Sequence, residues 1–239
     1  MVVLSPDEVV FWQWGFVTIN ETIVFTWLVM ALLVIFGWLS ARRLSMDPPL
    51  SRSQNLFETL ITYMQSQIRE ITQMSPDRYL PFSGTLFLFI SVANLLDIIP
   101  GYRTPTSSLS TTAALAISVF FAVPIYGIAQ SGFVGYLKHY IEPTPLMFPF
   151  HVIGEFSRTL ALAVRLFGNM MSETMLIAIL LTIAPLFLPV ILELLGLLIG
   201  QVQAYIFAVL ATVYIVSASS NEEKIEKSSD EILKFLKSN

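Results

Sequence analysis

The chain has 239 residues, of which 55% are hydrophobic and only 13% are charged, whereas globular domains are about 25% charged. Its mean hydropathy of +0.71 is typical of an integral membrane protein. The absence of cysteine excludes disulfides, thiolate nucleophiles and cysteine-based metal sites. The net charge of −4, with much of the acid after Asn221, argues against nucleic acid as a partner.

The N-terminal segment, residues 1–22, carries Asp7 and Glu8, and its first twenty residues contain no lysine or arginine. Because a secretory signal peptide begins with a basic segment, we expect this N-terminus to be retained. The first apolar segment, residues 23–39, is about long enough to cross a bilayer. Arginines at 42, 43 and 52 follow it at once, so the positive-inside rule predicts a cytoplasmic end here and an external N-terminus.

Residues 54–74 show a different pattern, with apolar side chains at spacings of three and four and polar ones on the other face. This periodicity predicts an amphipathic helix on the cytoplasmic membrane surface. A second span is expected over residues 82–99, ending at Pro100. A third is expected over residues 113–132, with Pro124 inside it.

The last two apolar segments, residues 152–184 and 190–217, are too long for simple perpendicular spans. Helices of about 28 to 33 residues measure about 42 to 50 Å, whereas the hydrocarbon core is about 30 Å thick. We therefore expect a tilted helical hairpin over 152–217. For the charged cytoplasmic tail, 218–239, a short helix and a solvated tail are equally supported.

These segments predict one membrane domain, 1–239. The expected fold is an all-α integral membrane protein with about five membrane helices plus one amphipathic surface helix, the last two long and tilted as a hairpin. A chain of this kind suits a bacterial inner membrane, with the N-terminus outside and the C-terminus in the cytoplasm, although an organelle-encoded protein would look the same.

Arg165 lies inside the longest apolar region, and a guanidinium there costs from roughly 3 to above 10 kcal/mol. No Asp or Glu occurs one turn away, so we expect another helix or another protein to supply the counter-charge. On a helix, Arg158, Arg165 and Ser172 fall on one stripe of small and polar residues, which presents the guanidinium to a partner. A snorkelling arginine is an equally good interpretation of Arg158.

Intramembrane carboxylates usually mark ion relays, which favours functional roles for Glu173 and Glu193. Asn94 and Asp97, near the outer end of the second span, are candidates to line an aqueous entry, although Asp97 is equally well explained as an exposed acid. Glu155 suits the positive end of a helix dipole and offers an ion pair to the arginine three residues later.

The last helix also carries Gln201 and Gln203, beside a ridge of small residues that ordinary helix packing explains. No zinc motif, P-loop or nucleophile elbow occurs. We therefore expect neither catalysis, nor a cofactor, nor a bound metal.

Three motifs in combination are distinctive, and together they extend over roughly residues 20–217. They are Arg165-Leu-Phe-Gly-Asn-Met170 followed by Glu173, Pro81-Phe82-Ser-Gly-Thr-Leu-Phe-Leu-Phe-Ile90 with Asn94-Leu-Leu-Asp-Ile-Ile-Pro100, and Gln203-Ala-Tyr-Ile-Phe207. This combination resembles subunit a of F-type ATP synthases, the stator of the membrane FO sector.

The resemblance implies that the chain faces a rotating ring of c subunits through two ion half-channels and couples proton flow to ATP synthesis or hydrolysis at a remote catalytic head. It implies that Arg165 is the essential arginine, that Asn169 lies beside it, that Glu173 lines a half-channel, and that Gln203 faces the arginine. The possible further lining residues of the half-channels are Asn94, Asp97, Glu155, Arg158, Ser172 and Gln201. The implied partners are the c-subunit ring, the b subunit or subunits of the peripheral stalk, the remainder of the F1FO complex, and membrane lipid.

Two positions depart from the family pattern. Glu173 is one residue closer to the arginine than expected, and Gly196 replaces the usual acid or histidine seven residues before Gln203; Glu193, one turn earlier, is a candidate substitute. Sodium coupling is therefore kept as an alternative to protons. A secondary transporter that binds an anionic substrate at Arg165 is a rival from another class, as is a purely structural scaffold.

Overall fold

A computed structural model describes residues 10–14, 17–42, 52–72, 76–99, 101–141, 147–183 and 188–238. Five of its helices are long and apolar enough to cross a membrane, and the two final ones are in contact. The predicted all-helical membrane fold is thereby confirmed. The helices are α1 (Glu21–Arg42), α2 (Arg52–Thr72), α3 (Leu80–Leu95), α4 (Leu109–Ile141), α5 (Met147–Ile183) and α6 (Leu188–Ser238).

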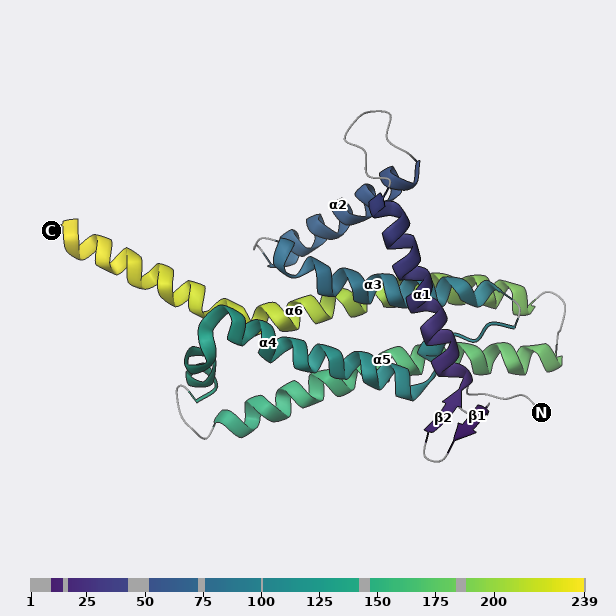
Figure 1. Cartoon of the computed structure of the whole chain (residues 1–239). Helices are drawn as coiled ribbons and strands as arrows, with labels where there is room; N and C mark the ends of the chain where they lie inside the picture. Colours follow the sequence, from purple (N-terminus) through teal and green to yellow (C-terminus); the bar gives the residue numbers. More distant parts are fainter. Residues whose placement is uncertain are drawn as a thin grey trace.

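The spans are arranged so that α3 lies along α6 and α4 lies along α5, while α1 crosses them steeply (Figure 1). The amphipathic helix α2 packs against α3 and α6. Its strong segregation of apolar and polar residues agrees with the pattern seen in the sequence. The C-terminal part of α6 extends away from the other helices (Figure 1).

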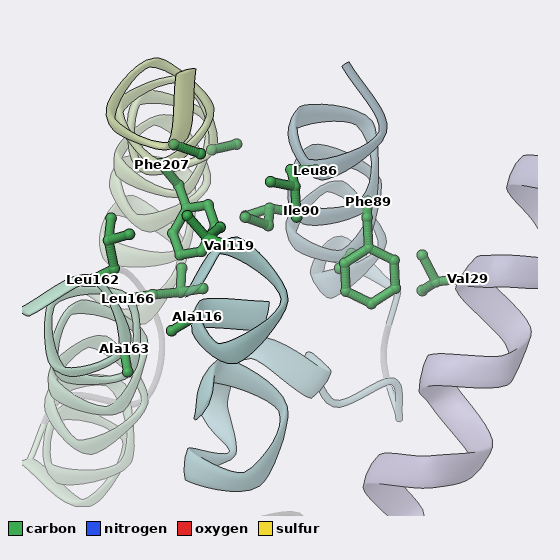
Figure 2. Packing of buried hydrophobic residues seen from close by; sticks show 13 residues of the cluster. Val29, Leu86, Phe89, Ile90, Ala116, Val119, Leu162, Ala163, Leu166 and Phe207 are labelled. Carbon is green, nitrogen blue, oxygen red and sulfur yellow. The ribbon is translucent and has the colours of Figure 1, made fainter. Parts of the chain in front are cut away.

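One continuous apolar core joins α1, α3, α4, α5 and α6. Figure 2 shows Phe207 of α6 among side chains from α3, α4 and α5, with Val29 of α1 reaching Phe89 from the side. Alanines on four of these helices are also buried. Because small side chains let helix backbones approach closely, they allow the tight packing that holds membrane helices together.

The sequence analysis did not anticipate the hairpin before α1. Strands β1 (Val10–Trp14) and β2 (Val17–Asn20) pair in antiparallel register. Of the N-terminal segment, residues 10–14 and 17–22 are described, so the expectations for residues 1–9 lie outside the described residues.

The connection between α3 and α4 is exposed in its first half and buried in its second half. It consists of two short 3₁₀ turns, η3 (Leu96–Ile98) and η4 (Pro105–Ser107), with Gly101 between them at φ 91°. A positive φ of this size favours glycine, because a Cβ would be strained there. The turn η4 is buried and contacts α5, α4, α1 and α3, so this connection fixes the outer ends of several helices relative to one another.

Three helices extend beyond their predicted ends. Helix α4 continues past Gly132, where a non-helical backbone (φ 72°, ψ 163°) separates the predicted span from a second helical segment. Helix α5 begins at Met147, and α6 continues as helix to Ser238, through the segment for which a helix and a solvated tail were equally expected. The expected features at Arg43 and Pro100, and the connection between the last two helices over residues 184–187, lie outside the described residues.

Candidate functional site

Arg165 is exposed on the outer surface of α5, while Leu162 and Leu166 on a neighbouring face of the helix are buried in the core. Within the described residues, Arg165 forms no ion pair. The helix therefore displays an unpaired guanidinium at its surface, as the pattern of small residues predicted.

One turn beyond Arg165, Asn169 connects α5 to α6. Its amide Nδ2 donates a 2.7 Å hydrogen bond to Oε1 of Gln203. Gln203 is only 3% exposed, and its own Nε2 is buried without a protein partner. A buried amide donor left free in a membrane helix is costly, so the site holds hydrogen-bonding capacity that water or an incoming group can use.

Glu173 projects from α5 onto the backbone of α6 at Gly196. A Cβ at residue 196 would lie 1.4 Å from Oε1 of Glu173 and 2.0 Å from its Cδ. The carboxyl group thus occupies the space that any side chain at position 196 would fill. This contact gives a physical reason for both departures from the family pattern, since a carboxylate at position 173 and a glycine at position 196 fit each other.

Glu173 also lies between two cavities. The inner cavity, of about 10 Å³, is lined by Glu173 together with Asn94, Asp97 and Glu193, and it has room for about one water molecule. The outer cavity, of about 200 Å³, is lined by Glu173 together with Asn169 and Ser172. The structure therefore brings five of the predicted polar residues around one glutamate.

Tyr102, in the connection outside the membrane spans, is close enough to Asp97 to interact with its charge. Burial, and secondarily the negative charge of Asp97, raise the pKa of Tyr102 above its ordinary value. The hydroxyl therefore remains protonated beside the carboxylate. Its oxygen is buried without a protein partner, which is typical of a position that hydrogen-bonds to water.

Asn94 and Gln201, predicted to line a half-channel, are both hydrogen-bonded across the α3–α6 interface. Nδ2 of Asn94 donates to the carbonyl of Gly200 at 2.9 Å, and Nε2 of Gln201 donates to the carbonyl of Ser91 at 3.0 Å. Asn94 is 3% exposed, so only part of its surface faces the inner cavity.

Arg158 and Glu155 form an ion pair at 3.6 Å on α5, and the arginine side chain is 52% exposed. Glu155 lies eight residues inside α5, because the helix begins at Met147. The helix-dipole interpretation of Glu155 is therefore wrong, since the dipole acts within the first turn. The guanidinium also lies 5.7 Å from the ring centroid of Tyr214.

The outer faces of α5 and α6 around Arg165 are strongly apolar. Large hydrophobic side chains on both helices are about half exposed or more, among them Phe156, Leu160, Val164, Leu176, Ile179, Leu194, Leu198 and Val202. An exposed apolar surface of this extent faces either lipid or another membrane helix. No cluster of metal-ligating side chains occurs among the described residues.

Sequence reasoning missed three side chains of this region: Ser91, Tyr102 and Thr106. Serine, threonine and tyrosine near helix ends are too common to single out, and only their hydrogen bonds and burial identify them. The contact between Glu173 and Gly196 could not be predicted either, because the sequence showed only a glycine without an evident reason at position 196.

Fold and site define a polytopic helical membrane protein that presents, at membrane depth, a cavity-lining glutamate and an arginine with no ion pair among the described residues, as expected of an ion-translocating subunit. The model of the ATP synthase A chain family matches residues 23–216. Curated relatives include "ATP synthase subunit a 1" of Chlorobaculum parvum, 60% identical over 92% of this chain and 98% of the relative. Another is "ATP synthase subunit a 2" of Acaryochloris marina, 54% identical over 96% of this chain and 98% of the relative. A third, "ATP synthase subunit a" of Nitrosospira multiformis, is 56% identical over 95% and 91% respectively.

The chain belongs to the ATP synthase A chain family. It is a multi-pass membrane protein and a non-catalytic subunit of an F-type ATP synthase, and its function is proton translocation in the FO sector. Family membership removes the two rivals from other classes, the secondary transporter and the structural scaffold.

Proposed function

We propose that Arg165 is the charge that ionised carboxylates of a moving c-subunit ring approach as ions leave and enter the membrane sector. The single observation that carries this assignment is an exposed guanidinium without a counter-charge inside a membrane span. The half-exposed apolar faces of α5 and α6 that surround it support a docked membrane partner rather than open water.

The chemistry follows from electrostatics. A neutral ring carboxyl can move through lipid, whereas an ionised one cannot without a large cost. Beside Arg165 the ionised form is favoured, so a ring carboxyl loses its proton there. The fixed positive charge also keeps protons from passing directly between the two half-channels. Each charge that crosses the membrane draws about 2.3 kcal/mol per 100 mV, and ring rotation carries this energy to the catalytic head.

We propose that one half-channel runs through the cavities on either side of Glu173. Asp97 and Glu193 line the inner cavity with Glu173, and Asn169 and Ser172 line the outer one. The order of these residues supports a relay from the outer ends of α3 and α6 through Glu173 to the face that carries Arg165. Arg158 and Glu155, further toward the start of α5, are candidates for the second half-channel.

The remaining assignments are proposals of the same kind. The c-subunit ring would bind the face of α5 and α6 around Arg165, and the b subunit or subunits of the peripheral stalk would bind elsewhere on the chain. The proposed location is a bacterial plasma membrane, with the N-terminus outside and the C-terminus in the cytoplasm.

The test of Arg165 is ATP-driven proton pumping in inverted vesicles that contain the assembled complex, followed with a pH-sensitive dye. We expect Arg165→Ala to abolish pumping while the complex still assembles. Arg69→Ala, which removes an exposed arginine on α2, is the matched control and should pump normally. Normal pumping by Arg165→Ala would refute the assignment.

Sodium coupling is tested separately by measuring ATPase activity of the intact complex over a range of sodium concentrations. Proton coupling predicts no activation by sodium. A rise in activity with sodium, together with sodium uptake by the vesicles, would identify sodium as the transported ion and leave the role of Arg165 unchanged.

A further inference from the structure

Helices α3 and α6 are joined by several side-chain hydrogen bonds within a single turn of each helix. Asn94 donates to the carbonyl of Gly200, Gln201 donates to the carbonyl of Ser91, and the Ser91 hydroxyl donates to Gln201 Oε1. These three bonds between Ser91, Asn94, Gly200 and Gln201 hold one turn of α3 against one turn of α6.

The turn is also held from outside the two helices. The Thr106 hydroxyl donates a 2.8 Å hydrogen bond to Oδ1 of Asn94, and Thr106 is fully buried in the turn η4. Both polar ends of the Asn94 side chain are thus occupied, one by α6 and one by the α3–α4 connection. A side chain with both ends bonded and 3% exposure is poorly suited to exchange ions with a channel.

Gly200 permits this arrangement. A Cβ at position 200 would lie 2.9 Å from Nδ2 of Asn94 and 3.1 Å from its Cβ. Because the second of these atoms is attached directly to the α3 backbone, a rotation of the asparagine side chain cannot remove the clash. If residue 200 gains a side chain, the asparagine amide must move away and the two helices must separate by a few tenths of an ångström.

The position of this turn connects it to the functional face. Gln203 follows Gly200 by three residues, which is almost one helical turn, and its Oε1 accepts the hydrogen bond from Asn169 of α5. Asn169 is in turn one turn beyond Arg165 on the same helix. A displacement of α6 at Gly200 would therefore move the glutamine that connects α6 to the arginine helix.

We propose that Asn94, held by Thr106 and seated on Gly200, is a positioning residue that sets the register of α6 so that Gln203 stays against Asn169 beside Arg165. This inference rests on the proposed function, because it assigns Asn94 to the alignment of that site rather than to the lining of a half-channel. Losing the contact lets α6 shift, which loosens the barrier between the half-channels.

The experiment compares Asn94→Ala, Gly200→Ala and the double variant in assembled F1FO, with Gly84→Ala as the control. Gly84 lies on α3, and its added Cβ would meet only Met64, at an ordinary 3.9 Å. Two quantities are measured: passive proton permeability of vesicles stripped of F1, and assembly by co-purification of the complex.

We expect Asn94→Ala to raise passive proton permeability measurably above the parent level without loss of assembly, because it removes the hydrogen bonds to Gly200 and Thr106 that hold α6 in register. Gly200→Ala should have a larger effect, and the double variant should recover part of it, because alanine at position 94 keeps its Cβ but removes the amide nitrogen that would lie 2.9 Å from the new Cβ. Unchanged permeability in Asn94→Ala, or a double variant no better than Gly200→Ala, would overturn the proposal.

If Gly200→Ala prevents assembly, Thr106→Val keeps the proposal testable. It removes the hydroxyl that holds Asn94 and preserves the volume of the side chain, so we expect a smaller rise in permeability, with rescue by Thr106→Ser. Permeability equal to the parent in Thr106→Val would contradict the proposal. Failure of the Arg165 assignment would be visible separately, as normal pumping in Arg165→Ala with the permeability results unaffected.

Discussion

The α3–α6 interface and the outer face of α5 differ in whether their polar side chains are bonded to other groups of the chain. At the interface, Asn94 and Gln201 are hydrogen-bonded across two helices, whereas Arg165 on the outer face has no ion pair within the described residues. A buried polar group must find its partner inside the chain. A charge without a partner inside the chain indicates a partner outside the chain. This difference separates the residues that stabilise the fold from those that we assign to the function.

Glu173 stands between these two regions, and the substitution Gly196→Ala tests its placement. The new Cβ would lie 1.4 Å from Oε1 of Glu173, so the carboxyl group must leave its position. Because that group is the far end of a flexible side chain, we expect the fold to survive while ATP-driven pumping falls by up to about 100-fold, the loss that a misplacement of about 1 Å can cause.

The control for Gly196→Ala is Gly37→Ala on α1, where a Cβ would meet nothing within 4 Å. Pumping rates in vesicles and the thermal stability of the complex are measured for both variants. If Gly196→Ala pumps as well as Gly37→Ala, the position of the Glu173 carboxyl group is not important for translocation.

A second prediction compares the buried and exposed sides of the membrane helices by the same change, Leu→Ala. Leu166, which follows Arg165 on α5, is 0% exposed, whereas Leu32 on α1 is 39% exposed. Leu166→Ala should destabilise the protein by about 2 to 5 kcal/mol through the cavity that it leaves. Leu32→Ala should cost less than about 1 kcal/mol, since lipid can fill the space.

Thermal unfolding of the purified complex, or protease resistance of this subunit, measures that difference. Equal destabilisation by the two variants would show that α1 is covered by a partner in the complex rather than by lipid.

The smallest effect is expected from Glu155→Gln. Its ion pair with Arg158 has the arginine half exposed, and pairs of this kind contribute about 0 to 1 kcal/mol. We expect a change in stability within that range, and a loss of pumping below about twofold if Glu155 acts only through this ion pair. A much larger loss of pumping at unchanged stability would instead identify Glu155 as a half-channel residue.

The sequence was sufficient for the features that depend on local pattern. The five spans, the amphipathic helix and the length of the final pair follow from hydropathy and periodicity, since each helix satisfies its own backbone in the bilayer. The cost of an isolated guanidinium identified Arg165 in the same way. Helix ends were less predictable, because α4, α5 and α6 continue as helix through residues whose composition is typical of loops.

Residue pairs from different helices could not be predicted from the pattern. From the sequence, Gly196 was interpreted as the loss of an acidic residue, whereas in the structure the Glu173 carboxyl group occupies the place of its side chain. Asn94 was interpreted as a channel residue, whereas both polar ends of its side chain are hydrogen-bonded within the chain. The turn η4 shows the same limit, since a short polar segment gives no sign that it will be buried.

The sequence by itself determined the class of protein, its membrane helices, and the arginine that requires an external partner, because burial in lipid constrains each residue according to its own chemistry. Only the tertiary structure decided which polar residues are bonded within the chain and which remain available, because that outcome depends on the register between helices. In this protein the register is fixed where Asn94 meets Gly200 and where Glu173 meets Gly196.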